Sequence, residues 1–153
     1  MKRLTKLMSV FAAGALFMGA LAGCGGSKDA GKAGDTIKVG ALLEMTGGSA
    51  SFGISSKNGI DLALKKINEK GVLGGKKLSL VVADTKSEAS EATNGMQKLV
   101  SQDKVVAVIG PNQSSAVIAA GAINNGSKVL GITPMGTNPD VTVDPKTKKT
   151  KEY

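Results

Sequence analysis

The chain has 153 residues, 41% hydrophobic and 21% charged, a balance typical of one folded domain rather than of a disordered chain. It contains no His and no Trp, and aromatic residues make up 3%, which excludes an imidazole base and disfavours a surface that stacks nucleobases. The net charge of +8 is concentrated near the two ends, and no basic stripe with interleaved aromatics occurs, so no nucleic-acid partner is expected.

Residues 1–23 are typical of an export signal: a basic beginning, an apolar run over 7–22 and small residues before Cys24. A membrane span needs about 20 predominantly apolar residues, and this run is shorter and rich in Gly and Ala; a retained signal anchor is the alternative. Leu21-Ala22-Gly23-Cys24 resembles the lipobox of bacterial lipoproteins, whose cysteine receives a diacylglyceryl group. We therefore expect lipidation of Cys24 and a membrane anchor of two acyl chains.

Residues 24–35 contain no large apolar residue and are expected to form a flexible linker. From residue 36 onward two patterns alternate. Apolar runs with strand propensity predict strands over 37–43, 77–84, 105–110 and 128–133. Helical periodicity predicts helices over 55–71, 87–103 and 114–126. Apolar strands separated by helices predict a doubly wound α/β fold with a parallel sheet.

Local signals place particular side chains within the helices. In the first, the apolar positions Ile60, Ala63, Leu64 and Ile67 recur at helical spacing, opposite to lysines. In the second, Ser87 is expected to be the N-cap. The inner face of that helix is predicted to carry three apolar residues, Met96, Leu99 and Val100.

Ligands of such sheets lie outside the carboxyl ends of the strands, which selects the loops 44–53, 84–87, 110–115 and 133–139. Ser114 and Ser115, where the third helix begins, could be a nucleophile, an anion cradle or a helix cap. Catalysis is disfavoured because the chain has no His and no G-x-S-x-G turn, and the P-loop pattern is absent as well. The cradle and the cap remain, and Thr137 offers a second hydroxyl or is a turn residue.

Four segments of the chain resemble the branched-chain amino acid-binding proteins of ABC transporters, which have the type I periplasmic binding-protein fold. These segments are IKVGALLEMTGGSASFG, NGIDLALKKINEKGVLGGKKLSLVVAD, VIGPNQSSA and GITPMGTNPD. The resemblance covers residues 36–143. It implies that Ser114, supported by Ser115, and Thr137 bind the α-carboxylate of a ligand. It also implies that the backbone carbonyl of Met135 holds the α-ammonium and that Phe52 covers the ligand.

On this resemblance, residues 36–143 form part of the N-terminal lobe and 144–153 a tail that leads to a missing segment. The second lobe and the hinge are absent, so residues 24–153 alone are not expected to bind an amino acid usefully. We expect a solute-binding lipoprotein of an ABC importer that binds an amino acid of the branched-chain type or a similar small carboxylate or amide. It is not expected to be an enzyme, has no expected cofactor or metal, and would be anchored outside the cytoplasm. Its partners would be an amino acid ligand and ABC permease subunits. The alternatives are an extracellular sensory domain and, disfavoured by the missing His, a hydrolase.

Overall fold

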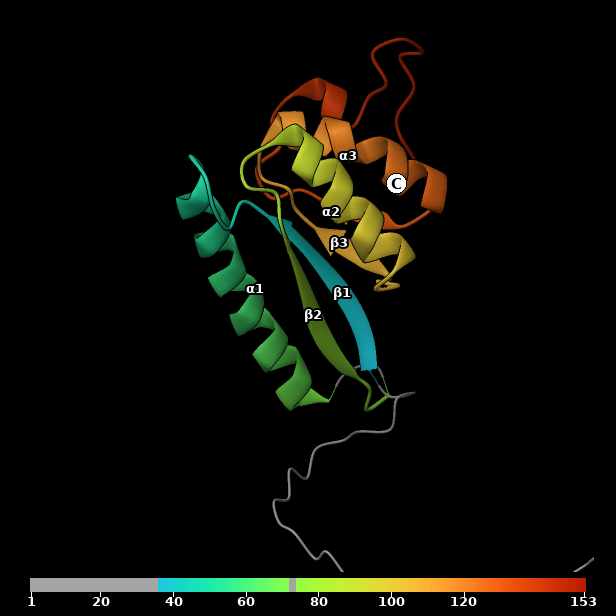
Figure 1. The fold of residues 1–153 in the computed structure, drawn as a ribbon. Helices are drawn as coiled ribbons and strands as arrows, with labels where there is room; N and C mark the ends of the chain where they lie inside the picture. The colour runs from blue at the N-terminus through green and yellow to red at the C-terminus, as the bar shows by residue number, and fades with distance from the viewer. Residues whose placement is uncertain (1–35, 72–73) are drawn as a thin grey trace, which may run out of the picture. The chain divides into compact units, whose positions relative to one another are not determined.

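Four parallel strands form one sheet in the order β2-β1-β3-β4 (Figure 1). They belong to a computed structural model that describes residues 36–71 and 74–153; the predicted signal sequence, Cys24 and linker lie outside the described residues. The strands are β1 (Thr36–Leu43), β2 (Lys77–Asp84), β3 (Ala107–Ile109) and β4 (Leu130–Ile132). Because all four run parallel, their carboxyl ends and the loops that follow lie at one edge of the sheet.

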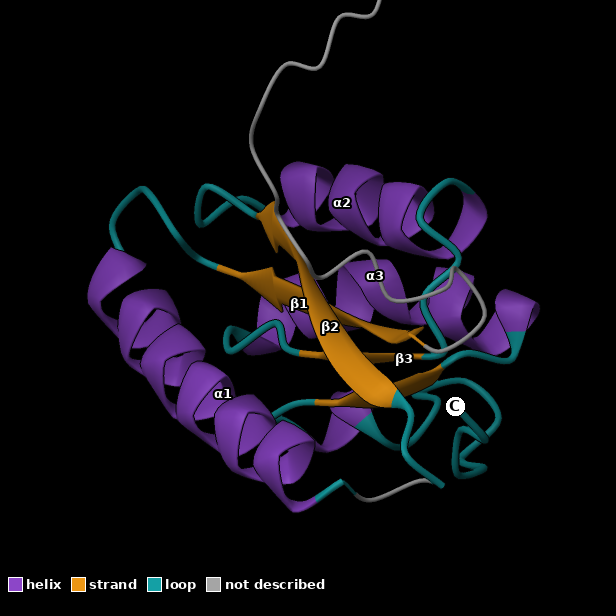
Figure 2. Ribbon diagram, turned by 90° about the horizontal axis from the view of Figure 1, so that it is seen from below, coloured by secondary structure: helices purple, strands orange, loops and turns teal. Residues whose placement is uncertain are grey.

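Helices cover both faces of the sheet, as Figure 2 shows. Helix α1 (Ala50–Lys70) lies against one face, and α2 (Ala89–Ser101) and α3 (Ser114–Ser127) lie together on the other. A short 3₁₀ helix, η1 (Pro139–Val141), follows β4 and packs against α3. The doubly wound parallel architecture expected from the sequence is therefore confirmed.

The best-buried core lies between the sheet and the pair α2 and α3. Its fully buried members share an apolar side chain: Leu42, Ala92, Met96, Leu99, Val105, Val108, Ala116 and Ala120. Met96 and Leu99 are on the inner face of α2, as predicted, and Val100 packs half-buried against them. Most of the buried apolar side chains of the described residues are therefore on this face, and their burial stabilises the fold.

The face under α1 is covered less completely. Ile60, Leu64 and Ile67 of α1 are half-buried, as their spacing predicts, whereas Ala63 is exposed. These side chains and Val39 of β1 line an apolar groove of about 350 Å³ between the helix and the sheet. Leu62, on the outer side of α1, is 55% exposed.

Several predicted boundaries were wrong. Helix α1 begins at Ala50 rather than near residue 55, because Gly53 allows its first turn to pass directly over the backbone of Glu44. β4 begins at Leu130 rather than at 128, because Lys128 ends α3 in the left-handed conformation, at φ 57°. β3 ends at Ile109, and Gly110, at φ 96°, turns the chain away from the sheet.

Residues 144–153, which the sequence analysis assigns to a tail, contain a turn. An antiparallel bridge joins Val143 to Thr150. Within the turn, the carboxylate of Asp144 accepts hydrogen bonds from the backbone N–H groups of Lys146 (2.9 Å) and Thr147 (2.7 Å). The Lys151 ammonium donates to the carbonyl of Asp140 at 2.5 Å, so the turn is held against η1.

Candidate functional site

The N-terminus of α3 and the loop after β4 meet at the carboxyl edge of the sheet. Ser114 is the first residue of α3, and its Oγ accepts a hydrogen bond from the backbone N–H of Asn138 at 3.3 Å. The predicted cap role of Ser114 is wrong: Gln113 is the N-cap, and no side chain of the cap residue bonds the first turn. Ser114 is one position past the N-cap, and its hydroxyl bonds loop 133–139 instead of the first turn of α3.

Thr133, which the sequence analysis did not select, fixes this loop from its other end. Its hydroxyl donates to the carbonyl of Pro111 at 2.6 Å and accepts from the N–H of Gly136 at 3.0 Å. One side chain thus joins the start of loop 133–139 to the loop that precedes α3. The sequence predicts a loop over 133–139, but it does not reveal that the threonine at the end of the strand bonds Pro111, more than twenty residues away.

The structure places the other predicted site residues on loop 133–139 and on the first turns of α3 and α1, with exposed side chains. Thr137 directly precedes Asn138 and is exposed, and Met135 is 45% exposed. Ser115 is exposed in the first turn of α3. Phe52 is 51% exposed in the first turn of α1. The hydrogen bond of Ser114 brings loop 133–139 to α3, whereas no hydrogen bond within the described ranges joins Phe52 to either segment.

A buried polar network connects α3 to α1 behind this surface. Glu44, the residue after β1, is fully buried, and its Oε1 accepts from the N–H groups of Asn112 (3.1 Å) and Gln113 (3.2 Å). The side chain of Asn112 accepts from Ser56 Oγ of α1 at 3.2 Å. The side chain of Gln113 donates to Ser49 Oγ, just before α1, at 2.8 Å. Sequence reasoning missed this network, because a lone Glu after a strand is typical of a solvated loop.

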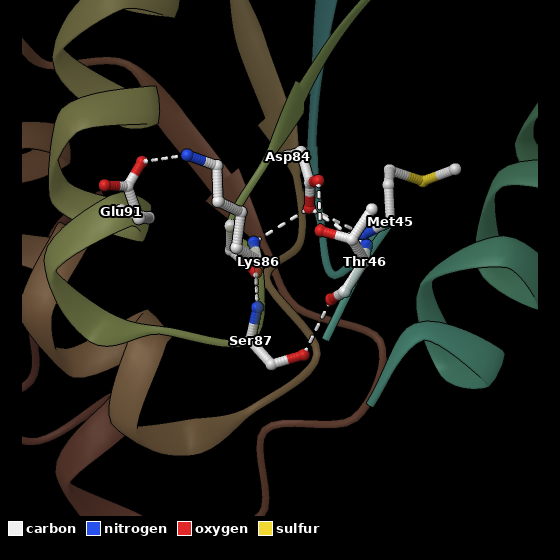
Figure 3. Close-up of polar contacts among 7 residues, drawn as sticks. Met45, Thr46, Asp84, Lys86, Ser87 and Glu91 are labelled. Atoms are coloured by element: carbon white, nitrogen blue, oxygen red, sulfur yellow. Dashed lines mark hydrogen bonds and ion pairs between the residues drawn. The ribbon is translucent and has the colours of Figure 1, made fainter. Parts of the chain in front are cut away.

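Asp84, at the end of β2, fastens the loop after β1, as Figure 3 shows. Its Oδ1 accepts from the backbone N–H groups of Met45 (2.9 Å), Thr46 (3.2 Å) and Lys86 (2.8 Å), and its Oδ2 accepts from the Thr46 hydroxyl at 2.7 Å. The carboxylate therefore binds two loops that lie on neighbouring strands.

Ser87 strengthens the same junction and is not the N-cap of α2. The N-cap is Glu88, without a side-chain cap bond. Ser87 adopts a left-handed conformation, at φ 64°, and its Oγ donates to the carbonyl of Thr46 at 2.9 Å (Figure 3). The same Oγ accepts from the N–H of Ser49 at 3.1 Å. The Ser87 hydroxyl, which the sequence pattern assigns to a helix cap, instead joins the loop before α2 to the loop after β1.

The hydrogen bonds around Asp84 make the fold sensitive to acid. Burial by itself raises the pKa of the Asp84 carboxyl, but the bonds from Thr46, Lys86 and Met45 together outweigh burial and lower the pKa below its usual 3.8. A lowered folded-state pKa means that the carboxylate stabilises the fold fully above pH 3.8. This contribution is lost as the pH falls from there through the folded-state pKa.

Replacing Asp84 with Asn should therefore lower the free energy of unfolding by about 1–2 kcal/mol at pH 7 and by less at pH 3. Urea denaturation at both pH values measures the difference. Asp61→Asn is the control, because Asp61 makes a solvent-exposed 2.6 Å ion pair with Lys57 and should change stability by less than about 1 kcal/mol. An equal loss for Asp84→Asn at both pH values would contradict the expected pH dependence.

Within the described ranges, no three His, Cys, Asp or Glu side chains gather as a metal ion would require. No helix in those ranges has both the length and the hydropathy to cross a membrane.

The carboxylates of Glu44 and Asp84 are directed at backbone N–H groups. Ser114 and Ser115 contribute neutral hydroxyls in the first turn of α3, and the N-terminus of a helix carries a partial positive charge.

Comparison with known families agrees with this arrangement. The family model described as periplasmic binding protein matches residues 36–149, which is most of the chain. The chain belongs to the periplasmic binding-protein family. Among the curated relatives of this periplasmic binding protein is an amino acid binding protein of Pseudomonas aeruginosa, 38% identical over 106 residues. The alignment covers 69% of the present chain and 28% of that relative.

Two solved structures extend the comparison of this periplasmic binding protein. One is the branched-chain amino acid transporter substrate-binding protein LivJ of Streptococcus pneumoniae in complex with isoleucine, with a TM-score of 0.69 and 38% identity over 74% of the present chain. The other is a solute-binding protein of an ABC transporter from Rhodopseudomonas palustris in complex with 3,4-dihydroxybenzoic acid, with a TM-score of 0.65 and 31% identity over 71% of the chain. The match covers 32% of the first structure and 29% of the second. The family and fold that the sequence resemblance implied are confirmed.

Proposed function

We propose that this chain supplies the carboxylate-binding part of a solute-binding protein that delivers an amino acid, or a similar small carboxylate, to the permease subunits of an ABC importer. The observation that carries the proposal is the junction of Ser114 with loop 133–139 through the N–H of Asn138. It brings a hydroxyl, a helix N-terminus and a second loop with Thr137 to one place at the strand ends. The protein acts outside the cytoplasm and binds its ligand without chemical change.

The hydrogen-bonding capacity of Ser114 supports this role. A serine hydroxyl has one proton to donate and can accept two bonds. Ser114 Oγ accepts from Asn138, so its proton can be donated to a ligand carboxylate. The N–H groups of the first turn of an α-helix have no partner within the helix and carry a partial positive charge. Ser115, also in that turn, supports the same oxygen atoms of the ligand.

The remaining groups have complementary roles in the proposal. Thr137 donates its hydroxyl to the second carboxylate oxygen, the backbone carbonyl of Met135 accepts from the ligand ammonium, and Phe52 covers the apolar part of the ligand. The ligands of the two solved relatives support giving the carboxylate contacts more weight than the ammonium contact. Isoleucine and 3,4-dihydroxybenzoic acid both contain a carboxyl group, but only isoleucine contains an amine. The carboxylate is therefore the shared feature of the ligand.

Removing either hydroxyl should weaken ligand binding. In the natural protein, Ser114→Ala and Thr137→Ala should each cost about 1.5–3 kcal/mol, or about 10- to 150-fold in Kd, because each removes a hydrogen bond to a charged group. Titration calorimetry with L-leucine and L-isoleucine measures the change. Ser90→Ala, at an exposed position of α2, is the matched control and should bind normally. Unchanged affinity in both site variants, with the fold intact, would contradict the proposal.

We further propose that Cys24 anchors the protein to the cell membrane through a diacylglyceryl group, on the support of the sequence Leu21-Ala22-Gly23-Cys24. Two acyl chains give stable anchoring, whereas one is marginal. Cys24→Ala should abolish lipidation and move the protein from the membrane fraction to the soluble one. Cell fractionation, with metabolic labelling by a fatty acid, measures both effects. A variant that stays in the membrane and remains unprocessed would instead identify residues 1–23 as a signal anchor.

A further inference from the structure

We propose that Glu44 is a positioning residue for the ligand site: its buried carboxylate fixes the N-terminus of α3 relative to α1 and so sets ligand affinity without contacting the ligand. This inference rests on the proposed function, because it takes the start of α3 to be the ligand-binding end. Nothing in the composition of the loop predicts it. It depends on contacts that join residues far apart in the sequence.

The first contact concerns where α3 begins. Glu44 Oε1 accepts from the N–H groups of Asn112 (3.1 Å) and Gln113 (3.2 Å), the two residues that directly precede Ser114. The chain reaches them through Gly110, whose missing side chain allows it to pass against the carbonyl oxygen of Leu42. The direction in which the first turn of α3 leaves the sheet is therefore set by one carboxylate oxygen at the end of β1.

The second set of contacts joins the same network to α1. Asn112 and Gln113 use their side chains to hold Ser56 and Ser49, at 3.2 and 2.8 Å. Between these two serines, Gly53 packs directly on the backbone of Glu44. The segment that contains Phe52 and the segment that contains Ser114 therefore both pack against or bond to Glu44. Moving Glu44 would change the separation of the two.

The energetics favour positioning over simple stabilisation. Glu44 is 0% exposed and Asn112 only 4%. Glu44 Oε2 and Asn112 Nδ2 are buried and make no hydrogen bond to any described residue. A buried polar atom without a partner costs free energy, and such groups in native structures are concentrated where geometry serves a function. An apolar residue at position 44 would avoid that cost but would leave the start of α3 without its acceptor.

The test compares ligand affinity, stability and local amide exchange in the natural protein. Glu44→Ala removes the acceptor and should weaken binding of L-leucine by about tenfold or more, because two buried N–H groups at the start of α3 lose their partner. Glu44→Gln keeps an oxygen at the Oε1 position and should bind within about threefold of the unsubstituted protein. Hydrogen exchange should be faster at the amides of Asn112 and Gln113 in Glu44→Ala and unchanged in Glu44→Gln.

A matched control separates positioning from general loss of stability. Leu99→Ala removes a buried side chain of the core under α2, beside Gly40 in the middle of β1 rather than at the strand ends, and should destabilise the fold at least as much as Glu44→Ala, yet bind L-leucine normally. If Glu44→Ala does not fold, Gln113→Ala, which removes only the bond to Ser49, should still weaken binding by about threefold.

The outcomes distinguish this inference from the function on which it rests. Normal affinity in Glu44→Ala, or in Gln113→Ala where that variant replaces it, would overturn the positioning role alone. Equal losses of affinity in Leu99→Ala and Glu44→Ala would also overturn it. If the unsubstituted protein does not bind L-leucine or L-isoleucine, the proposed function fails, and the positioning role fails with it.

Discussion

Replacing Gly53 with alanine should lower the free energy of unfolding by about 3 kcal/mol. A Cβ atom at this position would overlap the backbone carbonyl of Glu44, and neither backbone can move without displacing β1 or the first turn of α1. Overpacking against a backbone costs more than overpacking against a flexible side chain, because the interior is already close-packed. Urea denaturation of the variant and the unsubstituted protein measures the loss.

Gly59→Ala is the matched control, because Gly59 lies in the same helix and a Cβ there would meet no atom within 4 Å. Alanine is a better helix former than glycine by about 1 kcal/mol, so this variant should be slightly more stable than the unsubstituted protein. Gly53→Ala gains the same helix propensity, and the difference between the two variants therefore isolates the contact with Glu44. A Gly53→Ala protein as stable as Gly59→Ala would show that α1 does not cross the end of β1 as described.

Leu42→Ala should cost about 2–5 kcal/mol of stability, the range for emptying a buried leucine site. Leu42 is 0% exposed at the centre of the core between the sheet and α2 and α3. Leu62→Ala removes the same atoms from a side chain that is 55% exposed on α1 and should change stability by no more than about 0.5 kcal/mol. Chemical denaturation of both variants tests the assignment of the core. Similar losses in the two would mean that Leu62 is as buried as Leu42, and would contradict its position on the outer side of α1.

Much of the fold could be predicted from the sequence because the decisive signals are local. Apolar strands and amphipathic helices alternate along the chain, and that alternation determines a parallel sheet with helices on both faces. The inner positions of α2, Met96 and Leu99, follow from helical spacing alone, and both are buried. The boundaries were less predictable: α1 begins at Ala50 because of a contact between Gly53 and Glu44, which no local pattern reveals.

The candidate site could be predicted only in part, for the same physical reason. The strand-end loops and the hydroxyls of Ser114 and Thr137 are visible in the sequence, and the structure brings the loop of Thr137 to Ser114. The residues that hold these loops are not visible. Glu44 and Asp84 are typical loop carboxylates by sequence. However, Glu44 accepts from the N–H of Asn112, 68 positions away, and Asp84 accepts from the N–H of Met45, 39 positions away. Ser87 satisfies a local cap rule yet bonds Thr46.

The central claim, that the start of α3 and loop 133–139 hold the carboxylate of a small ligand, is tested most directly by comparing L-leucine with L-leucinamide in titration calorimetry on the natural protein. The two ligands share the side chain and the amine and differ only at the group that Ser114 and Thr137 are proposed to bind. L-leucinamide should bind at least about 100-fold more weakly, because two charge-assisted hydrogen bonds are lost. Equal affinity for the two ligands would contradict a carboxylate site at this end of the sheet.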